Sequence, residues 1–271
     1  MPEGDTLRAA ADRLGPLLRG RTLQRFWAKK LAGHRPTAGQ TIEDVRAVGK
    51  HLLIDFDRDL TLRTHLGMTG SWRPVTAERA DVARLGPQLR VLIVVDGGGA
   101  ACFAAPTVTT FLRSGDDDPV EHLGPDLSDA ELDLVGIEAR VASLAGDSTL
   151  LVDLLLDQRI AAGVGNVYKS EVLFRCGHPP DARVGDLDHE RLAQLFVVAH
   201  DLLRRNVARP ETRRETAPGG GYFVYGRNRQ PCLRCGTPVR RTVNGRTARS
   251  TYWCPTCQPV RPGASSTWSV S

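Results

Sequence analysis

The stretch CLRCGTPVRRTVNGRTARSTYWCPTC, residues 232–257, separates the pair Cys232 and Cys235 from the pair Cys254 and Cys257 by eighteen residues. Two CxxC pairs at such a spacing supply four thiolates, the number that a tetrahedral zinc ion binds. The residues between the pairs form two strand-like runs around an Asn-Gly dipeptide, which is typical of a hairpin turn. The stretch therefore predicts a zinc ribbon built on a β-hairpin, and the alternatives are two disulfides or a fortuitous spacing.

Arginine dominates the hairpin that this ribbon would present. The side chains concerned are Arg240, Arg241, Arg246 and Arg249. A unit this small buries almost no apolar core, so the metal would have to hold it together. What the hairpin presents is guanidinium, and we therefore expect an anionic partner.

Charge is unevenly distributed along the chain. Residues 204–261 contain thirteen arginines, no lysines and two acids, a charge of +11. Because the whole chain carries +5, the remainder carries −6. A basic C-terminal module on an acidic body favours a polyanion as partner, and the arginine fork suits phosphate.

The composition is that of a soluble globular protein, with 41% apolar and 25% charged residues. No run of eighteen apolar residues occurs, so we expect no membrane span. The acidic start MPEGD does not resemble a signal peptide. Six cysteines, four of them in metal-binding spacing, suit the reducing cytoplasm.

Short strand-like runs dominate the first part of the chain, after a helix that begins near Asp5. They cover residues 22–28, 42–48, 51–56, 60–65, 90–95, 100–105 and 108–112. Glycine, proline or charged turns separate them, with a hairpin turn expected at residues 97–99. This pattern favours a mostly antiparallel β-sandwich or barrel, and we predict a β-sandwich with flanking helices over residues 1–118.

Helical periodicity begins after the acidic, turn-rich residues 114–126. Apolar side chains on one face predict helices over residues 149–160 and 190–206, and a third helix should run from Asn166 to near Gly177. The chain is thus expected to be α+β with two domains. The boundaries fall as follows: a helical domain over 119–215, a zinc-ribbon module over 216–262 and a disordered tail over 263–271.

The N-terminus offers a reactive amine. Removal of Met1 ahead of the small Pro2 would expose a secondary amine, and an α-amino group has a pKa of about 8. Such an amine can attack an aldehyde-like carbon to give an iminium, which serves as an electron sink for elimination. Glu3 could move a proton beside it. The ordinary alternative is a common Met-Pro start with a first-turn acid.

Three further residues allow both a structural and a functional interpretation. Lys50 follows a glycine between two strand-like runs, and its structural interpretation is a solvated lysine in a turn. Met68 lies among glycines after a strand, either as a core methionine or as a wedge that enters a base stack. Asn166 follows a glycine turn, where it would either cap the helix or donate its amide to a phosphate.

Five motifs, which follow one another along the chain, contain these candidate residues. They are MPEGD at 1–5, VGKHLL at 48–53, HLGMTG at 65–70, GVGNVYKSE at 163–171 and the ribbon with RSTYWCPTCQ at 249–258. Together, over residues 1 to about 260, they resemble the formamidopyrimidine-DNA glycosylase and endonuclease VIII family of bifunctional DNA repair enzymes. The segment from Gly163 to Ser170 resembles that family's helix–two-turns–helix element.

The resemblance implies three catalytic residues. Pro2 matches the nucleophile that attacks deoxyribose C1′ and displaces the damaged base, and Glu3 matches the acid/base that assists opening of the sugar ring. Lys50 matches the lysine that contacts phosphate near the lesion and aids catalysis. Because the electron sink is the protein amine, no redox or nucleotide cofactor is expected.

The resemblance also implies how DNA and metal are held. Asn166 and Arg249 match the pair that grips the phosphates flanking the flipped nucleotide, and Met68 matches the position that fills the vacated stack. C1′ is shielded within a duplex, so the nucleotide must flip out. The four cysteines match the ligands of one structural Zn²⁺.

The departures from the family pattern concern the substrate. The formamidopyrimidine branch carries an Arg-Arg-Phe-Gly stretch after its central strands, whereas residues 105–113 here read APTVTTFLR. The chain is therefore closer to the endonuclease VIII branch, whose bases are mainly oxidised pyrimidines. Met68 and the YGR stretch at 225–227 resemble the other branch, so a preference for oxidised purines is an alternative.

The expected protein is a DNA glycosylase/AP lyase of base excision repair that cuts the strand by β,δ-elimination. Its partner would be damaged DNA, and it would act as a monomer in the cytoplasm, associated with the nucleoid and not with a membrane. The alternative from another class is a non-catalytic zinc-ribbon scaffold that senses distorted DNA.

Overall fold

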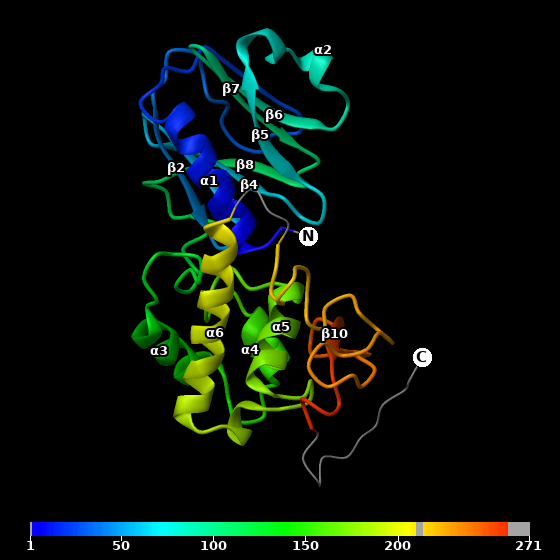
Figure 1. Ribbon diagram of the computed structural model, residues 1–271. Coiled ribbons are helices and arrows are strands. Elements are labelled where there is room, and N and C mark those ends of the chain that lie inside the picture. Colours follow the sequence, from blue (N-terminus) through cyan, green and yellow to red (C-terminus); the bar gives the residue numbers. More distant parts are fainter. Residues whose placement is uncertain (1, 210–213, 260–271) are drawn as a thin grey trace. The chain divides into compact units, whose positions relative to one another are not determined.

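The structure, a computed structural model, describes residues 2–209 and 214–259. The chain divides into two compact units, residues 1–122 and 123–271, which are drawn in Figure 1. The tail predicted over residues 263–271 lies outside the described residues. The α+β class with two domains is confirmed.

Two four-stranded antiparallel sheets form the body of the first unit. One has the strand order β1-β6-β7-β5 and the other the order β2-β3-β4-β8. The strands are β1 (Arg25–Ala28), β2 (Ile42–Val48), β3 (His51–Phe56), β4 (Leu60–His65), β5 (Ser71–Thr76), β6 (Leu89–Val95), β7 (Gly98–Phe103) and β8 (Thr107–Leu112). The unit also holds α1 (Gly4–Leu18), the short α2 (Val82–Leu85) and a 3₁₀ turn at Ala77–Arg79. The predicted N-terminal β-sandwich is confirmed.

The core of this unit lies between the two sheets and α1. Strand residues that alternate along β3 and β6, such as Ile54 and Val91, are buried in one apolar cluster. The helix α1 adds an apolar stripe at helical spacing, made by Leu7, Ala10, Ala11, Leu14 and Leu18. Figure 1 shows α1 alongside β2. The apolar stripe holds α1 against the core, and the first turn of this helix directly follows Pro2 and Glu3.

Several strand predictions need correction. The strand expected over residues 22–28 begins at Arg25, and the strand expected over 100–105 covers 98–103. The strand β5 was not predicted, because Pro74 interrupts the pattern; the proline is tolerated since β5 is an edge strand of its sheet. The turn expected at residues 97–99 is shorter, because Gly98 and Gly99 belong to β7. A Cβ atom on Gly99 would lie 2.0 Å from the carbonyl oxygen of Ile93, so this strand position requires glycine.

Helices and one hairpin build the second unit. They are α3 (Leu134–Leu144), α4 (Leu151–Leu156), α5 (Asn166–Cys176), a 3₁₀ turn at Val184–Asp186, α6 (His189–Val207), β9 (Arg240–Asn244) and β10 (Arg249–Trp253). The helix predicted over 149–160 is shorter, because the chain turns at Asp157, whose carbonyl oxygen accepts the N–H of Ile160. The apolar face predicted for α6 is buried in the core of this unit.

The helix α5 is the central element of the second unit. Its residues 166–174 are all buried, and it packs against α4, α6 and β10. Gly165 caps its start, and Gly177 ends it in the left-handed conformation that glycine favours. In Figure 1, α5 lies between α4 and β10, so one helix connects the helical part to the ribbon. No helix in residues 2–209 or 214–259 is long and apolar enough to cross a membrane.

Candidate functional site

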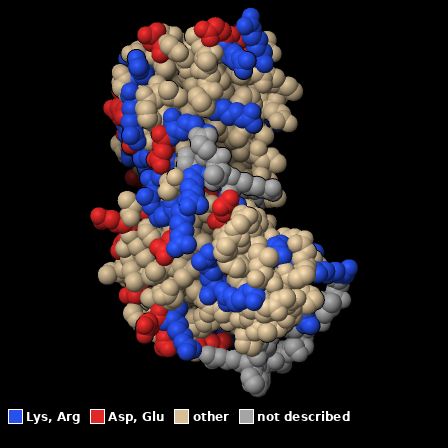
Figure 2. Space-filling view, viewed as in Figure 1, with Lys and Arg blue, Asp and Glu red and all other residues tan. Residues whose placement is uncertain are grey.

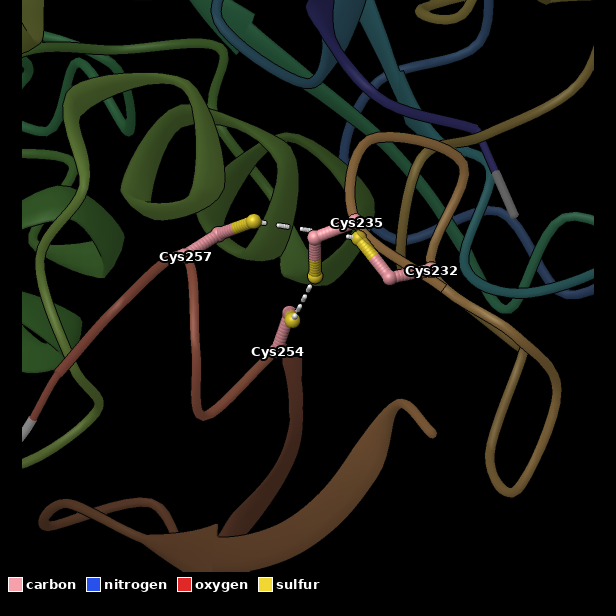
Figure 3. A group of neighbouring side chains, drawn as sticks. All are labelled: Cys232, Cys235, Cys254 and Cys257. Carbon is pink, nitrogen blue, oxygen red and sulfur yellow. Dashed lines mark hydrogen bonds between the residues drawn. The ribbon is translucent and has the colours of Figure 1, made fainter. Parts of the chain in front are cut away.

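The four cysteines of the ribbon converge on one point. Their Sγ atoms all lie within 4.8 Å of one another and point toward a common centre in Figure 3. The Sγ atoms of Cys232 and Cys257 are 3.9 Å apart, and those of Cys235 and Cys254 are 3.5 Å apart. A tetrahedron with Zn–S bonds of about 2.3 Å has S–S edges of about 3.8 Å, so the arrangement fits zinc. All six cysteines of the chain are free thiols, which excludes the disulfide alternative in the structure.

The surroundings of the thiols also favour a bound dication. Hydrogen bonds from Thr237 hold the pKa of Cys235 at about 6. Burial, followed by the neighbouring thiols, raises the pKa of Cys257 to about 12. Four sulfurs crowded in this way cannot all ionise without a cation, and a bound zinc ion would supply that charge. Since every ligand is a cysteine, the centre is a structural zinc site.

Contacts with the helical part hold the ribbon in place. The wholly buried Gln258 accepts the N–H of Cys254 at 2.9 Å and donates to the carbonyl oxygen of His178 at 2.7 Å. At the hairpin turn, Arg246 donates its backbone N–H to the carboxylate of Asp153 at 2.8 Å. The hairpin is thus fixed at both ends.

The hairpin arginines face outward. Arg249 begins β10 opposite Asn244, and it is exposed together with Arg240, Arg241 and Arg246. In the second unit many acidic side chains lie toward α3, whereas basic side chains lie over α6 and at scattered places around the ribbon, as Figures 1 and 2 show together. The face that carries the ribbon is therefore suited to an anion.

Asn166 is the first residue of α5 and is not its cap. Gly165 occupies the cap position, and the side-chain oxygen Oδ1 of Asn166 accepts a hydrogen bond from Nζ of Lys169 at 2.7 Å. Asn166 as a whole residue is 9% exposed. The structural alternative, a helix cap, is therefore not what Asn166 does here.

Two buried charged residues of α5 were missed by sequence reasoning. Lys169 and Glu171 are both 0% exposed. Lys169 links Asn166 to Ser250, and Glu171 binds the segment that leads into the ribbon. The only signal in the sequence was the spacing of Asn166 and Lys169, which lie three residues apart and so share a helix face.

Pro2 and Glu3 lie at the start of α1. Pro2 is half-buried, and Glu3 is 0% exposed at the cap position of the helix. The carbonyl oxygen of Glu3 accepts the N–H groups of Thr6 and Leu7, at 2.9 and 3.3 Å. The first turn of the helix therefore fixes the backbone that follows Pro2.

Lys50 occupies a two-residue turn between β2 and β3, after Gly49 with its positive φ of 57°. Beside it, the rings of His51 and His65 have centroids 5.1 Å apart. Burial lowers the pKa of His51 to about 3, with further lowering by Arg63, His65, His122 and Lys50. Burial, then Lys50 and Arg63, also lower the pKa of His65. Lys50 thus lies among imidazoles that are neutral at pH 7.

The Met68 loop joins β4 to β5 and exposes its methionine. Met68 is 70% exposed, so it is not a core residue. The N–H of Gly70 donates to the carbonyl oxygen of Leu66 at 2.9 Å, and a Cβ on Gly70 would lie 2.4 Å from that oxygen. The tight turn therefore needs glycine and holds an apolar side chain in solvent.

The structure brings some of the candidate residues together. The four cysteines form one cluster, and Lys169 joins Asn166 to the strand that begins with Arg249. Pro2, Glu3, Lys50 and Met68 belong to the first unit, whereas Asn166, Arg249 and the cysteines belong to the second.

Three family models match successive parts of the chain. They are the formamidopyrimidine-DNA glycosylase N-terminal domain at residues 1–108, the formamidopyrimidine-DNA glycosylase H2TH domain at 123–216, and the zinc finger found in FPG and IleRS at 229–260. The predicted helix–two-turns–helix region and zinc-ribbon hairpin are thereby confirmed.

Relatives match over nearly the whole length. "Probable endonuclease 8 2" of Streptomyces coelicolor is 41% identical, with 97% of each chain covered. "DNA-(apurinic or apyrimidinic site) lyase Nei2" of Mycolicibacterium smegmatis is 37% identical, over 95% of this chain and 99% of the relative. The crystal structure of MutM (Fpg) from Thermus thermophilus is 30% identical with a TM-score of 0.76, over 96% of this chain and 100% of that chain.

The fold and the three matched domains define a DNA glycosylase with an H2TH region and a zinc finger. The chain belongs to the formamidopyrimidine-DNA glycosylase and endonuclease 8 family.

Proposed function

We propose that this chain excises oxidised bases from DNA, with pyrimidines favoured, through a Schiff base formed by the N-terminal amine of Pro2. Membership of the family makes the chain a DNA glycosylase and abasic-site lyase of base excision repair. The residues that perform the reaction and the preferred bases are the proposed part.

The observation that carries the proposal is the start of α1, where Pro2 precedes a carboxylate that is 0% exposed. A secondary amine freed by removal of Met1 would attack C1′ of the damaged nucleotide, and the base would leave. Glu3 would transfer the proton that opens the sugar ring. The resulting iminium withdraws electrons and permits β-elimination and then δ-elimination of the flanking phosphates.

Phosphate contacts on both units would orient the nucleotide. Lys50 would bind the phosphate near the lesion, in a setting whose neutral histidines do not compete with it for the anion. Asn166 and Arg249 would grip the phosphates that flank the flipped nucleotide, since the start of α5 carries the partial positive charge of a helix N-terminus. The exposed Met68 would fill the gap left in the base stack.

The four-cysteine cluster would hold one structural zinc ion, which keeps the hairpin folded. The iminium itself serves as the electron sink, so the reaction would need no redox or nucleotide cofactor. We further propose that the chain acts as a monomer in the cytoplasm, associated with the nucleoid.

Borohydride trapping tests whether this lyase acts through a Schiff base. The processed protein is incubated with duplex DNA containing an abasic site, and the iminium is reduced to a stable adduct. A covalent adduct is expected. Correctly processed protein that binds this DNA but never forms an adduct would contradict the proposed Schiff base.

A panel of duplexes with single lesions tests the substrate preference. Thymine glycol and dihydrouracil should be excised faster than oxidised guanine, at matched enzyme concentration and salt. The reverse order would contradict the pyrimidine preference and support the oxidised-purine alternative, without affecting the trapping result at an abasic site.

A further inference from the structure

Lys169 is a fully buried lysine in the middle of α5, with an exposed fraction of 0%. Lysine is almost never buried in this way unless its ammonium group is paired. Here Nζ donates to Oδ1 of Asn166 at 2.7 Å and to the carbonyl oxygen of Ser250 at 3.1 Å. One ammonium group therefore joins the first turn of a helix to a strand of the zinc hairpin.

The first contact fixes the orientation of the Asn166 amide. An ammonium group can only donate, so the atom it contacts must be the carbonyl oxygen Oδ1. The NH₂ group of the same amide then points away from Lys169. That group is the part of Asn166 that can donate to a phosphate, so Lys169 determines which face of the amide is presented.

The second contact fixes the neighbouring strand. Ser250 directly follows Arg249 in β10, and its carbonyl oxygen is held by the same ammonium group that orients Asn166. Lys169 thus sets the position of two groups from segments about eighty residues apart.

We propose that Lys169 is a positioning residue that couples the Asn166 amide to the Arg249 strand, so that the two groups grip phosphates as one unit. This rests on the proposed function, in which Asn166 and Arg249 bind the DNA backbone. In this role Lys169 acts through its hydrogen bonds to Asn166 and Ser250 and not by touching the phosphate or the sugar.

A double-mutant cycle tests this coupling. Affinity is measured for a duplex that carries a tetrahydrofuran abasic analogue, which cannot form the Schiff base. Lys169→Met keeps an unbranched side chain, one atom shorter than lysine, and removes its donors. Because coupled residues give non-additive effects, Lys169→Met should weaken binding about tenfold in the parent chain but less than about threefold when Asn166→Ala is present. The cycle with Arg249→Ala should show coupling of the same sign.

Ser170→Ala is the matched control. Ser170 also joins α5 to β10, because its Oγ accepts the N–H of Tyr252 at 3.4 Å, but it contacts only the backbone oxygen of Asn166. Its effect should be the same with and without Asn166→Ala. The proposal would be overturned if Lys169→Met lowered DNA affinity equally with and without Asn166→Ala. It would also be overturned if Ser170→Ala were coupled to Asn166→Ala as strongly as Lys169→Met is. Either result would make Lys169 an ordinary packing residue.

The affinities of the single variants and the folding of every variant are also measured, so that a failed phosphate contact can be told from a misfolded protein. If Asn166→Ala and Arg249→Ala each leave affinity unchanged, the proposed phosphate contacts fail, and the positioning role fails with them. Zinc content and thermal unfolding are measured for every variant. If Lys169→Met does not fold, Lys169→Gln, which keeps a polar group at the buried position, is placed in the same cycle with the same expected non-additivity.

Discussion

The carboxylate of Glu171 accepts the backbone N–H of Val224 at 2.9 Å, across 53 positions of sequence. The same carboxylate accepts the N–H groups of Phe223 and Tyr225, at 2.9 and 2.8 Å, and the hydroxyl of Thr216. A fully buried charge is costly unless donors surround it, and this one is surrounded by donors. Glu171 therefore fixes the segment between α6 and the ribbon onto α5.

We expect Glu171→Gln to destabilise the second unit by about 2–4 kcal/mol, because one oxygen becomes an NH₂ group that faces N–H donors. The measurement is urea unfolding followed together with zinc release. Glu190→Gln, at an exposed acid of α6, is the control and should change stability by less than about 0.5 kcal/mol. If Glu171→Gln changed the free energy of unfolding as little as this control, the carboxylate would not hold the segment between α6 and the ribbon.

His51 should make the first unit sensitive to acid. Its pKa is about 3 in the fold against the ordinary value of 6.5, so the unfolded chain takes up a proton first as pH falls. The stability contributed by the neutral ring is full above pH 6.5 and is lost toward pH 3. Between pH 8 and pH 5 the free energy of unfolding should therefore fall by about 2 kcal/mol more in the parent protein than in His51→Gln, as the linkage between proton binding and folding requires.

Unfolding titrations at a series of pH values measure this difference. Glutamine keeps an acceptor for Nε of Arg63, which donates to Nδ1 of His51 at 3.2 Å. The exposed His34, changed to Gln, is the control. Parallel stability curves for the parent and His51→Gln would show that His51 is not kept neutral by the fold.

Cys254→Ser should abolish stoichiometric zinc binding. The fully buried Cys254 is one of four converging ligands, and its loss leaves three thiolates and no closed tetrahedral set. Zinc is measured by atomic emission after gel filtration, and DNA affinity should fall because the hairpin arginines lose their support. Cys176→Ser, outside the cluster, should retain zinc. A full complement of zinc in Cys254→Ser would refute the ligand assignment.

Arg249→Ala should change how DNA binding depends on salt. If Arg249 neutralises one phosphate, the slope of log affinity against log salt becomes shallower by about 1. The exposed Arg191 of α6, changed to Ala, is the control and should leave the slope as it is. An unchanged slope in Arg249→Ala would mean that this arginine does not contact the DNA backbone.

The elements with regular patterns could be predicted from the sequence. Strand-like runs separated by turn residues placed β2, β3 and β4 at their observed bounds, and most residues of β3 and β4 are buried. The cysteine spacing predicted the metal cluster, because ligand geometry constrains sequence spacing directly. Pro74 concealed β5, since sequence alone does not show which strand lies at a sheet edge.

The contacts of buried charges could not be predicted in this way. Lys169 and Glu171 find partners 81 and 53 positions away, and no periodicity connects them to Ser250 or Val224. Their burial depends on how α5 packs against the ribbon, which is a tertiary property. For the same reason, the exposure of Met68 at 70% became clear only from the loop geometry between β4 and β5.

The central claim is that the amine of Pro2 forms the covalent bond to the sugar. The most direct measurement is peptide mapping by mass spectrometry of the borohydride-reduced adduct, made with correctly processed protein and abasic DNA. The account predicts that the DNA remnant is attached to the N-terminal peptide, at the nitrogen of Pro2. Attachment at Lys50, at Lys169 or at any other residue would contradict it.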